Sequence, residues 1–496
     1  MKIINNFING KVIESDTNKY SDVYNPSTGE IIAKVINSNS NDLNEVINSS
    51  NKAFKIWSNF TPLKRSRIMS AYKTLLEKNI DILAEIVSQE HGKTLDDAKG
   101  SVTRGIEVVE FACGIPHLIK GEFSSNVGTN IDSWSSKNPI GISAGITPFN
   151  FPAMVPMWMY PISIACGNSF ILKPSEKDPS CALKLAELFT EAGLPDGVLN
   201  VINGNKQIVD LILEHKDISS ISFVGSTPVA KYIYETAAKY GKRVQSLGGA
   251  KNHLVVMPDA DLDQATTGII GAAFGSAGER CMAVSVAVAV GNIADKLLNK
   301  LEDSIEILKV APYTDPNSNM GPLISLEHKN KVERYIDIGV KENANLIVDG
   351  RNLKIQGYEN GYFVGPTLFD NVNKDMQIYK EEIFGPVLSI VRVKDYNEAL
   401  ELINDHQFGN GTSIYTSSGE VARDFTQNTN IGMVGVNVPI PVPMAFHTFG
   451  GWKQSLYGAH GMHGLEGINF YTKLKTVTSR WPSNSQSSPE FKMPTN

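Results

Sequence analysis

Cysteines, long apolar runs and common ligand-binding motifs are all scarce in this chain of 496 residues. Only four cysteines are present and none forms a CxxC pair, which argues against a zinc ribbon and a thioredoxin-type redox site. So few thiols favour a reducing compartment, and we expect a cytoplasmic protein. No HExxH motif occurs, and the neighbouring His460 and His463 are surrounded by glycines, so we predict no metal site.

The sequence also lacks a segment typical of a membrane span or a targeting signal. Its longest apolar stretch, residues 148–165, is interrupted by four prolines and an asparagine. The amino terminus has no apolar core and no basic amphipathic stretch, so we expect no signal or transit peptide. A net charge of −6 argues against a broad nucleic-acid-binding face. We therefore expect a globular protein that binds neither a membrane nor nucleic acid.

The residue pattern predicts an α/β protein with a doubly wound parallel sheet. Residues 1–36 are typical of short strands, and residues 41–109 have the three- and four-residue apolar spacing of helices. After residue 139, short apolar strands alternate with helices, which indicates βαβ units. The expected strands are residues 140–146, 169–172, 198–202, 220–224, 253–257 and 283–290, and the expected helices are residues 179–192, 207–214 and 262–274.

Cys281 is the first candidate for chemistry, because it follows a glycine-containing turn and precedes an apolar strand. A cysteine in this position can present its sulfur to a cleft. The neighbouring Arg280 would lower the pKa of the thiol and favour the nucleophilic thiolate. The pattern also allows a small buried core residue, which is the usual role of a free cysteine.

Polar residues follow the expected strands, at the positions where open α/β sheets bind ligands. Asn150 could donate its amide hydrogens to an oxyanion or could be an ordinary turn residue. Lys173 and Glu176 could hold ribose hydroxyls, with the carboxylate favouring NAD over NADP, or could begin a solvated helix. In Gly225-Ser226-Thr227-Pro228, a hydroxyl could cap a helix whose free amides suit a pyrophosphate.

In this order, these segments resemble the aldehyde dehydrogenase family over nearly the whole chain. The segments that carry the resemblance are Pro148-Phe149-Asn150-Phe151-Pro152, Lys173-Pro174-Ser175-Glu176, Phe223-Val224-Gly225-Ser226-Thr227, Gly278-Glu279-Arg280-Cys281 and Glu381-Glu382-Ile383-Phe384-Gly385-Pro386. The resemblance implies a doubly wound NAD-binding domain of residues 1–117 and 140–250, and an α/β catalytic domain of residues 251–465. It also implies a small β oligomerisation arm at residues 118–139 and 466–485 and a flexible tail at 486–496, in a homodimer or homotetramer.

The resemblance also implies a role for each residue of the site. Cys281 is similar to the family nucleophile, and Asn150 with the Cys281 backbone amide is similar to the oxyanion hole. The implied NAD contacts are Thr147, Phe149, Lys173 and Glu176 on the adenosine and strand-end side, Gly225 and Ser226 at the pyrophosphate, and Glu382 and Phe384 at the nicotinamide riboside.

One segment departs from the hydrolytic members of the family, which carry Glu-Leu-Gly-Gly-Lys. Here Ser246 takes the place of the glutamate that activates water, and Ala250 takes the place of the lysine. A neutral serine is a poor general base at neutral pH, and losing such a base costs roughly 10²–10⁴-fold in rate. A thiol is a better nucleophile than water and could release the acyl group without that base.

The departure resembles the CoA-acylating branch of the family, the methylmalonate-semialdehyde dehydrogenases. Its substrates carry a carboxylate, for which Arg104 and Arg280 are similar to a two-pronged clamp. Each arginine could instead be structural, Arg104 on a solvated helix and Arg280 in an ion pair with a neighbour such as Glu279. The resemblance implies oxidation of malonate or methylmalonate semialdehyde by NAD, with loss of CO₂ and transfer of the acyl group to CoA.

Two other functions stay open at this point. A hydrolytic semialdehyde dehydrogenase would need a relocated base, for which Glu279 and Glu382 are the candidates. A non-catalytic member of the fold would form no NADH, although the intact nucleophile and oxyanion segments argue against it.

Overall fold

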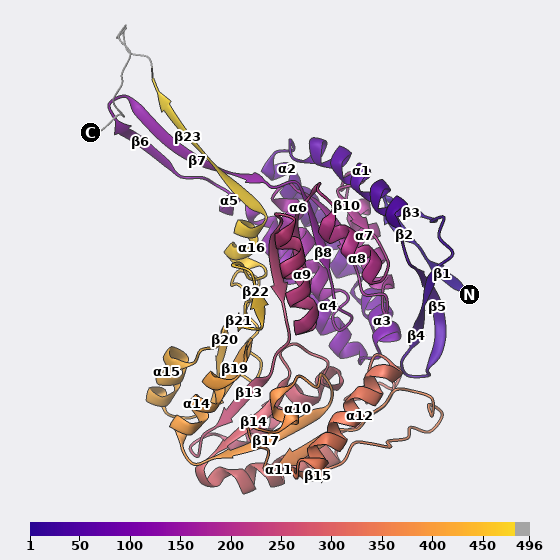
Figure 1. Cartoon of the computed structure of the whole chain (residues 1–496), viewed down its shortest axis with the longest axis vertical. Helices are drawn as coiled ribbons and strands as arrows, with labels where there is room; N and C mark the ends of the chain where they lie inside the picture. The colour runs from indigo at the N-terminus through magenta and orange to yellow at the C-terminus, as the bar shows by residue number, and fades with distance from the viewer. Residues whose placement is uncertain (482–496) are drawn as a thin grey trace.

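The computed structural model describes residues 1–481 and has two lobes, each built on a large sheet, with a long β arm projecting from the upper one (Figure 1). The upper sheet has eight strands in the order β22-β12-β11-β8-β9-β10-β2-β3. Its centre is parallel, and only the edge strands β2, β3 and β22 run antiparallel to their neighbours. The predicted doubly wound parallel sheet is therefore confirmed. The strands are β2 (Asn6–Ile8), β3 (Lys11–Ile13), β8 (Ile142–Ile146), β9 (Ser169–Lys173), β10 (Leu199–Val201), β11 (Ile218–Val224), β12 (Arg243–Leu247) and β22 (Leu456–Tyr457).

Helices cover both faces of the upper sheet, as the near-continuous burial of β8 and β9 requires. They are α1 (Ser40–Trp57), α2 (Pro62–Lys78), α3 (Ile80–His91), α4 (Leu95–Cys113), α5 (Ile115–Leu118), α6 (Met154–Ala165), α7 (Ser180–Glu191), α8 (Lys206–Glu214) and α9 (Thr227–Lys239). A separate sheet of order β1-β5-β4 lies at the amino terminus, with β1 (Lys2–Ile4), β4 (Tyr20–Asn25) and β5 (Glu30–Ile36).

The lower lobe contains a sheet of seven strands in the order β15-β16-β17-β14-β13-β19-β20, parallel except at β15. The strands are β13 (Asn252–Val256), β14 (Val284–Val290), β15 (Asn345–Val348), β16 (Thr367–Asp370), β17 (Val387–Val393), β19 (Gly411–Tyr415) and β20 (Met433–Val436). The helices are α10 (Leu262–Phe274), α11 (Ala294–Glu306), α12 (Leu326–Lys341), α13 (Gln377–Lys380), α14 (Tyr396–Asp405) and α15 (Gly419–Asn428). A two-stranded ribbon pairs β18 (Phe408–Gly409) with β21 (Trp452–Lys453).

The projecting arm is a three-stranded antiparallel sheet of β6 (Phe123–Gly128), β7 (Ile131–Pro139) and β23 (Thr472–Arg480). Its root is helix α16 (Gly464–Phe470), so the range 466–485 begins in a helix and becomes a strand at Thr472. The range 251–465 likewise includes β22, which belongs to the upper sheet. The expected tail at 486–496 lies outside the described residues.

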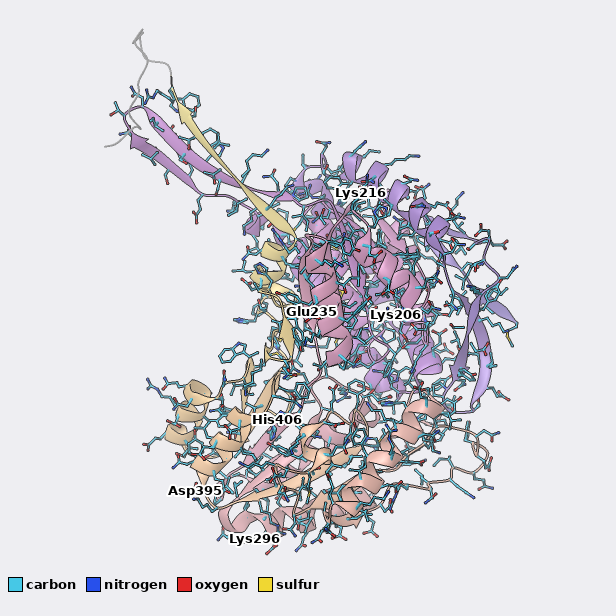
Figure 2. All side chains as sticks on the ribbon, viewed as in Figure 1. Lys206, Lys216, Glu235, Lys296, Asp395 and His406 are labelled. Carbon is cyan, nitrogen blue, oxygen red and sulfur yellow. The ribbon has the colours of Figure 1, made fainter. Side chains whose placement is uncertain are left out.

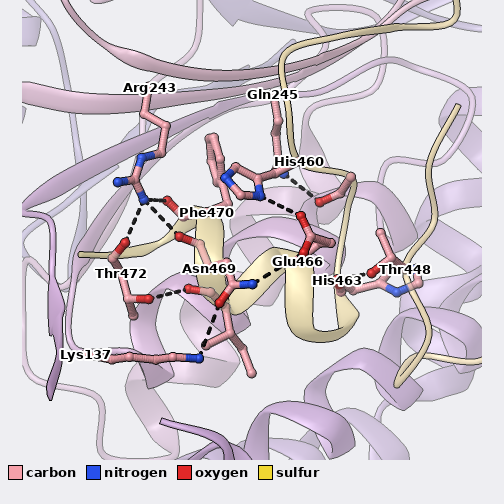
Figure 3. A network of polar contacts seen from close by, with 12 residues as sticks. Lys137, Arg243, Gln245, Thr448, His460, His463, Glu466, Asn469, Phe470 and Thr472 are labelled. Carbon is pink, nitrogen blue, oxygen red and sulfur yellow. Dashed lines mark hydrogen bonds and ion pairs between the residues drawn. The ribbon is translucent and has the colours of Figure 1, made fainter. Parts of the chain in front are cut away.

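A partly buried arginine ties the arm to the upper sheet (Figure 3). Arg243, at the start of β12, donates from Nη1 to the backbone carbonyls of Asn469, Phe470 and Thr472 at 2.6–2.9 Å. These carbonyls stand at the end of α16, where carbonyl groups lack intrahelical partners. Gln245, two residues further along β12, donates to the Gly461 carbonyl at 2.8 Å.

Charged side chains stand on the outer surfaces of both lobes (Figure 2). Lys206 and Glu235 lie on outer helices of the upper lobe, and Lys296 and Asp395 lie on the lower lobe. Lys206 pairs with Asp210 at 2.6 Å while remaining mostly exposed, so the pair contributes little to stability. Within residues 1–481, no helix combines the length and the apolar character that crossing a membrane requires.

Candidate active site

Cys281 lies at the junction of the lobes, between a tight turn and strand β14. The turn carries positive φ values in succession at Ser276 (54°), Ala277 (51°) and Gly278 (73°). At Gly278 a Cβ atom would lie 2.2 Å from the Gly385 carbonyl oxygen, so only glycine fits this approach. The Cys281 carbonyl accepts hydrogen bonds from Nδ2 of Asn252 at 2.9 Å and of Asn410 at 3.0 Å. The backbone of the candidate nucleophile is therefore held from two sides.

Asn150 reaches this turn from the loop after β8, which agrees with its predicted position beyond the end of a strand. Its Nδ2 donates to the Glu279 carbonyl at 3.0 Å, and the side chain is buried. The backbone carbonyl of Asn150 accepts a hydrogen bond from the buried Lys93 Nζ at 2.8 Å. An amide nitrogen has two hydrogens. One is used here, which leaves the second for an oxyanion formed beside Cys281.

A cavity of about 590 Å³ opens beside Cys281 and contains both predicted arginines in its wall. Arg280 Nη2 lies 2.6 Å from Asp97 Oδ1, and Arg104 Nη1 lies 2.5 Å from Glu107 Oε2. The ion-pair partner of Arg280 is thus Asp97 and not Glu279. Most of the remaining wall is apolar, with Phe151, Met154, Trp158, Ile440, Val442 and Phe449. The cavity can hold a small aldehyde that carries a carboxylate.

Arg280 lowers the pKa of the Cys281 thiol, as the sequence predicts, but a larger opposing effect leaves that pKa raised. Burial raises the pKa of Cys281 to about 12, and the nearby Glu382 carboxylate raises it further. Arg280 lowers the pKa by less than burial raises it. Its guanidinium charge is already balanced by Asp97, so Arg280 alone does not activate the sulfur.

The two candidate relocated bases occupy different places. Glu382 lines a small pocket with Cys281 and Phe384, and its Oε1 accepts a hydrogen bond from the Ala250 amide at 2.9 Å. Burial raises the pKa of Glu382. Glu279 is fully buried and faces two imidazoles. Its Oε2 lies 3.6 Å from His91 Nε2, and its Oε1 lies 3.5 Å from His328 Nε2. Burial raises the pKa of Glu279 to about 8, so this carboxyl is largely neutral at pH 7.

Ser246 has no part in the cavity. Its side chain is fully buried in β12, and its hydroxyl donates to the Ala230 carbonyl at 2.8 Å. Because that proton is committed to a backbone carbonyl of α9, Ser246 has neither the charge nor the freedom to activate water.

The strand ends of the upper sheet offer groups that fit a dinucleotide. Lys173 Nζ lies 2.8 Å from Glu176 Oε2 after β9. Burial opposes ionisation of Glu176, but the charge and hydrogen bond of Lys173, with further contributions from the Glu176 amide and Lys177, together lower the pKa of Glu176. Thr147 Oγ1 is buried with no hydrogen-bond partner among residues 1–481, and the Phe149 ring packs edge-on against Phe384 at 5.9 Å. A hydroxyl and a carboxylate that follow neighbouring parallel strands suit the hydroxyls of a sugar.

The predicted helix cap at Ser226 and Thr227 is wrong in its detail. Ser226 occupies the cap position of α9 and Pro228 lies in its first turn, but neither hydroxyl makes a cap hydrogen bond. Thr227 Oγ1 instead accepts the Gly249 amide at 2.8 Å. The first amides of α9, next to Gly225, therefore stay uncapped by side chains, which suits an anionic ligand.

Several residues of the site were not predicted from the sequence. Lys93 lies just before α4 and Asp97 lies in its first turn. Both are far along the chain from Asn150 and Arg280, which they contact. Asn252 stands in Gly249-Ala250-Lys251-Asn252-His253, a segment similar to the CoA-acylating branch, and that similarity could have pointed to it. No sequence motif pointed to Asn410.

No cluster of three or more histidine, cysteine, aspartate or glutamate side chains within residues 1–481 could hold a metal ion. His460 Nδ1 lies 2.6 Å from Glu466 Oε2 (Figure 3). His463 Nδ1 is 2.7 Å from the His447 carbonyl. Both histidines thus have protein partners near the root of the arm.

Two α/β lobes with a thiol and an amide donor at their junction are consistent with the oxidoreductase class that the sequence predicts. The chain belongs to the aldehyde dehydrogenase family, whose sequence profile matches residues 12–477. The resemblance inferred from the sequence is therefore confirmed.

Curated relatives and solved structures cover the chain almost completely. A malonate-semialdehyde dehydrogenase of Pseudomonas aeruginosa is 54% identical over 100% of both chains. One from Halalkalibacterium halodurans is 50% identical over 96% of this chain and 98% of its own. The crystal structure of a methylmalonate-semialdehyde dehydrogenase from Oceanimonas doudoroffii is 52% identical, with a TM-score of 0.96 over 97% and 99% of the two chains. A Sinorhizobium meliloti structure described by the same enzyme name, in complex with NAD, is 54% identical, with a TM-score of 0.97 over 98% and 99%.

Proposed function

We propose that this protein oxidises malonate or methylmalonate semialdehyde with NAD and transfers the acyl group to CoA. The products are acetyl-CoA or propionyl-CoA and CO₂. One combination of observations supports the proposal. A nucleophile and an oxyanion donor stand together at Cys281 and Asn150, while Ser246 replaces the water-activating glutamate of hydrolytic members and is buried with its hydroxyl donated to a backbone carbonyl. The names of the relatives support the choice of substrate.

The chain supplies three functions for the oxidation step. The Cys281 sulfur attacks the aldehyde carbon once its proton has left, and Glu382, which lines the same small pocket, is the carboxylate that would accept that proton. The free hydrogen of Asn150 Nδ2, with the Cys281 amide, stabilises the oxyanion of the thiohemiacetal. When bound, NAD supplies the hydride acceptor, and Lys173, Glu176 and Glu382 are the residues that would hold its riboses.

The arginines give the site its preference for a 3-oxo acid. Arg104 and Arg280 share one cavity wall with Cys281, so a substrate carboxylate would meet a guanidinium while its aldehyde meets the thiol. Oxidation leaves a thioester whose carbonyl withdraws electrons from the neighbouring carbon. That withdrawal makes the β-carboxylate labile and accounts for the loss of CO₂ before the CoA thiol takes the acyl group.

The domain roles are part of the same proposal. The upper lobe binds NAD, the lower lobe contributes Cys281, and the arm joins copies of the chain in a homodimer or homotetramer. The arm exposes large apolar side chains at Phe123, Val127 and Leu474, which supports a role in association. The four cysteines are all free thiols, which supports a cytoplasmic location.

The deciding experiment measures NADH formation by the purified protein with malonate semialdehyde and NAD, with and without CoA. We expect one equivalent of NADH per site without CoA, followed by steady turnover once CoA is added. Equal steady turnover in both conditions would overturn acyl transfer and favour hydrolysis with Glu382 as the relocated base. Absence of NADH with every aldehyde would overturn the oxidoreductase assignment.

A further inference from the structure

A buried ion cluster connects the cavity wall to Asn150. Arg280 Nη2 donates to Asp97 Oδ1 at 2.6 Å, and Lys93 Nζ lies 3.8 Å from Asp97 Oδ2. Lys93 Nζ in turn donates to the backbone carbonyl of Asn150 at 2.8 Å. Lys93 is fully buried, and the Asp97 and Arg280 side chains are about one-fifth exposed, toward the cavity they line. Asp97 is thus the one acid shared by the expected carboxylate ligand and by the support of the oxyanion donor.

The cluster places a charge restraint on substrate binding. The two cavity arginines already have an acid each, Asp97 for Arg280 and Glu107 for Arg104. An incoming carboxylate therefore competes with Asp97 for the guanidinium of Arg280. Arg280 Nε and Asp97 Oδ2 are buried and have no hydrogen-bond partner within residues 1–481, so the pair is not fully satisfied.

We propose that Asp97 is a positioning residue, which holds Arg280 and Lys93 in one cluster and so sets both the attraction of the cavity for a carboxylate and the place of Asn150. The effect on the carboxylate is a property of the cavity itself. The effect on Asn150 rests on the proposed function, because it is read out through oxidation of an aldehyde.

The first test measures alkylation of Cys281 by iodoacetate and by iodoacetamide, which differ in carrying or lacking a carboxylate. In both reactions the thiolate forms a C–S bond and iodide leaves, so the ratio of the two rates does not depend on the thiolate fraction. Asp97→Asn removes the competing charge and should raise the iodoacetate-to-iodoacetamide ratio about fivefold. Peptide mapping assigns the label to Cys281, since Cys113 is also partly exposed.

A matched control lies one residue away. Asp96 is on the same helix and loses the same charge in Asp96→Asn, but its side chain is exposed, so the ratio should stay at the wild-type value. An equal ratio in Asp97→Asn and Asp96→Asn overturns the proposal. If Asp97→Asn melts well below the wild type, Asp97→Ser, which removes the charge with less volume, takes its place in the same comparison.

The second test separates the two arms of the cluster by steady-state kinetics. Lys93→Met should lower kcat about tenfold for both malonate semialdehyde and uncharged propanal, with little change in KM, because Asn150 loses its support. Lys93→Arg, which keeps a donor, should recover part of that loss. Asp97→Asn should lower KM for the semialdehyde alone. Equal KM changes for both aldehydes contradict the proposal. A wild type that forms no NADH overturns the proposed function, while the alkylation ratio still decides the role of Asp97.

Discussion

Two polar clusters of the upper lobe, one at the root of the arm and one beside Cys281, are built differently. At the root of the arm, Arg243 and Gln245 give their hydrogens to backbone carbonyls (Figure 3). No residue labelled in Figure 3 has a buried side-chain polar atom without a hydrogen-bond partner within residues 1–481, although the Tyr471 hydroxyl at the end of α16 does. Beside Cys281, both nitrogens of His91, Glu279 Oε2 and Arg280 Nε are buried and unpaired within residues 1–481.

The difference separates a cluster that stabilises the fold from one that is kept ready for a ligand. Unpaired buried groups cost free energy, so they persist only where the surrounding packing holds them and where a ligand can use them. Substitutions at the arm root should therefore lower stability and leave the chemistry intact, and substitutions beside Cys281 should do the reverse.

The largest expected effect is at the nucleophile. Cys281→Ser should lower NADH formation from malonate semialdehyde by at least about 10⁴-fold, since a serine hydroxyl is a far weaker acid than a thiol and a poorer nucleophile. Its melting temperature should stay close to that of the wild type, because one atom changes at a partly exposed position. Retained NADH formation would show that the thiol is not the nucleophile.

The oxyanion donor comes next. Asn150→Ala should lower kcat by roughly 10²–10³-fold, the usual loss for one oxyanion donor. Asn150→Asp is the matched variant: it keeps the size of the side chain, loses both amide hydrogens and adds a charge, so it should be at least as slow. Activity within about threefold of the wild type in either variant would place the oxyanion elsewhere.

Arg243→Met tests the other cluster. The substitution leaves the carbonyls of Asn469, Phe470 and Thr472 without their donor, and we expect a loss of about 3 kcal/mol in unfolding free energy. Lys473→Met removes a cation from an exposed position of β23 and should cost almost nothing. The kcat of folded Arg243→Met should equal that of the wild type, and a large fall in kcat without a fall in stability would erase the contrast between the clusters.

Much of the fold could be predicted from the sequence because the relevant signals are local. The apolar spacing of residues 262–274 predicts α10 with its observed bounds, and the cap residue Asp261 accepts amides of the first turn as such residues do. The strands predicted at residues 140–146 and 169–172 differ from β8 and β9 by one or two residues at an end. In parallel strands both faces are buried, so the apolar run itself marks the strand.

The cluster beside Cys281 could not be predicted, because its contacts join segments that are distant in the chain. Asp97 meets Arg280 across 183 residues, and Lys93 meets Asn150 across 57. The predicted effect of Arg280 on the thiol has the expected direction but is outweighed: an adjacent cation is visible in the sequence, whereas the burial of the sulfur and the nearby Glu382 are not. The predicted cap on α9 failed, since Thr227 is taken by the Gly249 amide from the next loop.

The smallest expected effect concerns Glu279, whose burial raises its pKa from 4.5 to about 8 in the folded protein. The unfolded chain releases this proton near its ordinary pKa, about 4.3, while the folded chain keeps it. Stability from this group is therefore fully present below that value and is lost as the pH rises toward 8. Glu279→Gln has no proton to lose, so its melting temperature relative to the wild type should rise by about 3 °C between pH 5 and pH 8.5 in calorimetry. Its kcat should change little, because the carboxyl faces His91 and not the cavity. A melting-temperature difference that stays constant with pH would mean that Glu279 is ionised in the folded protein, and the cluster beside Cys281 would then hold a balanced charge like the one at the root of the arm.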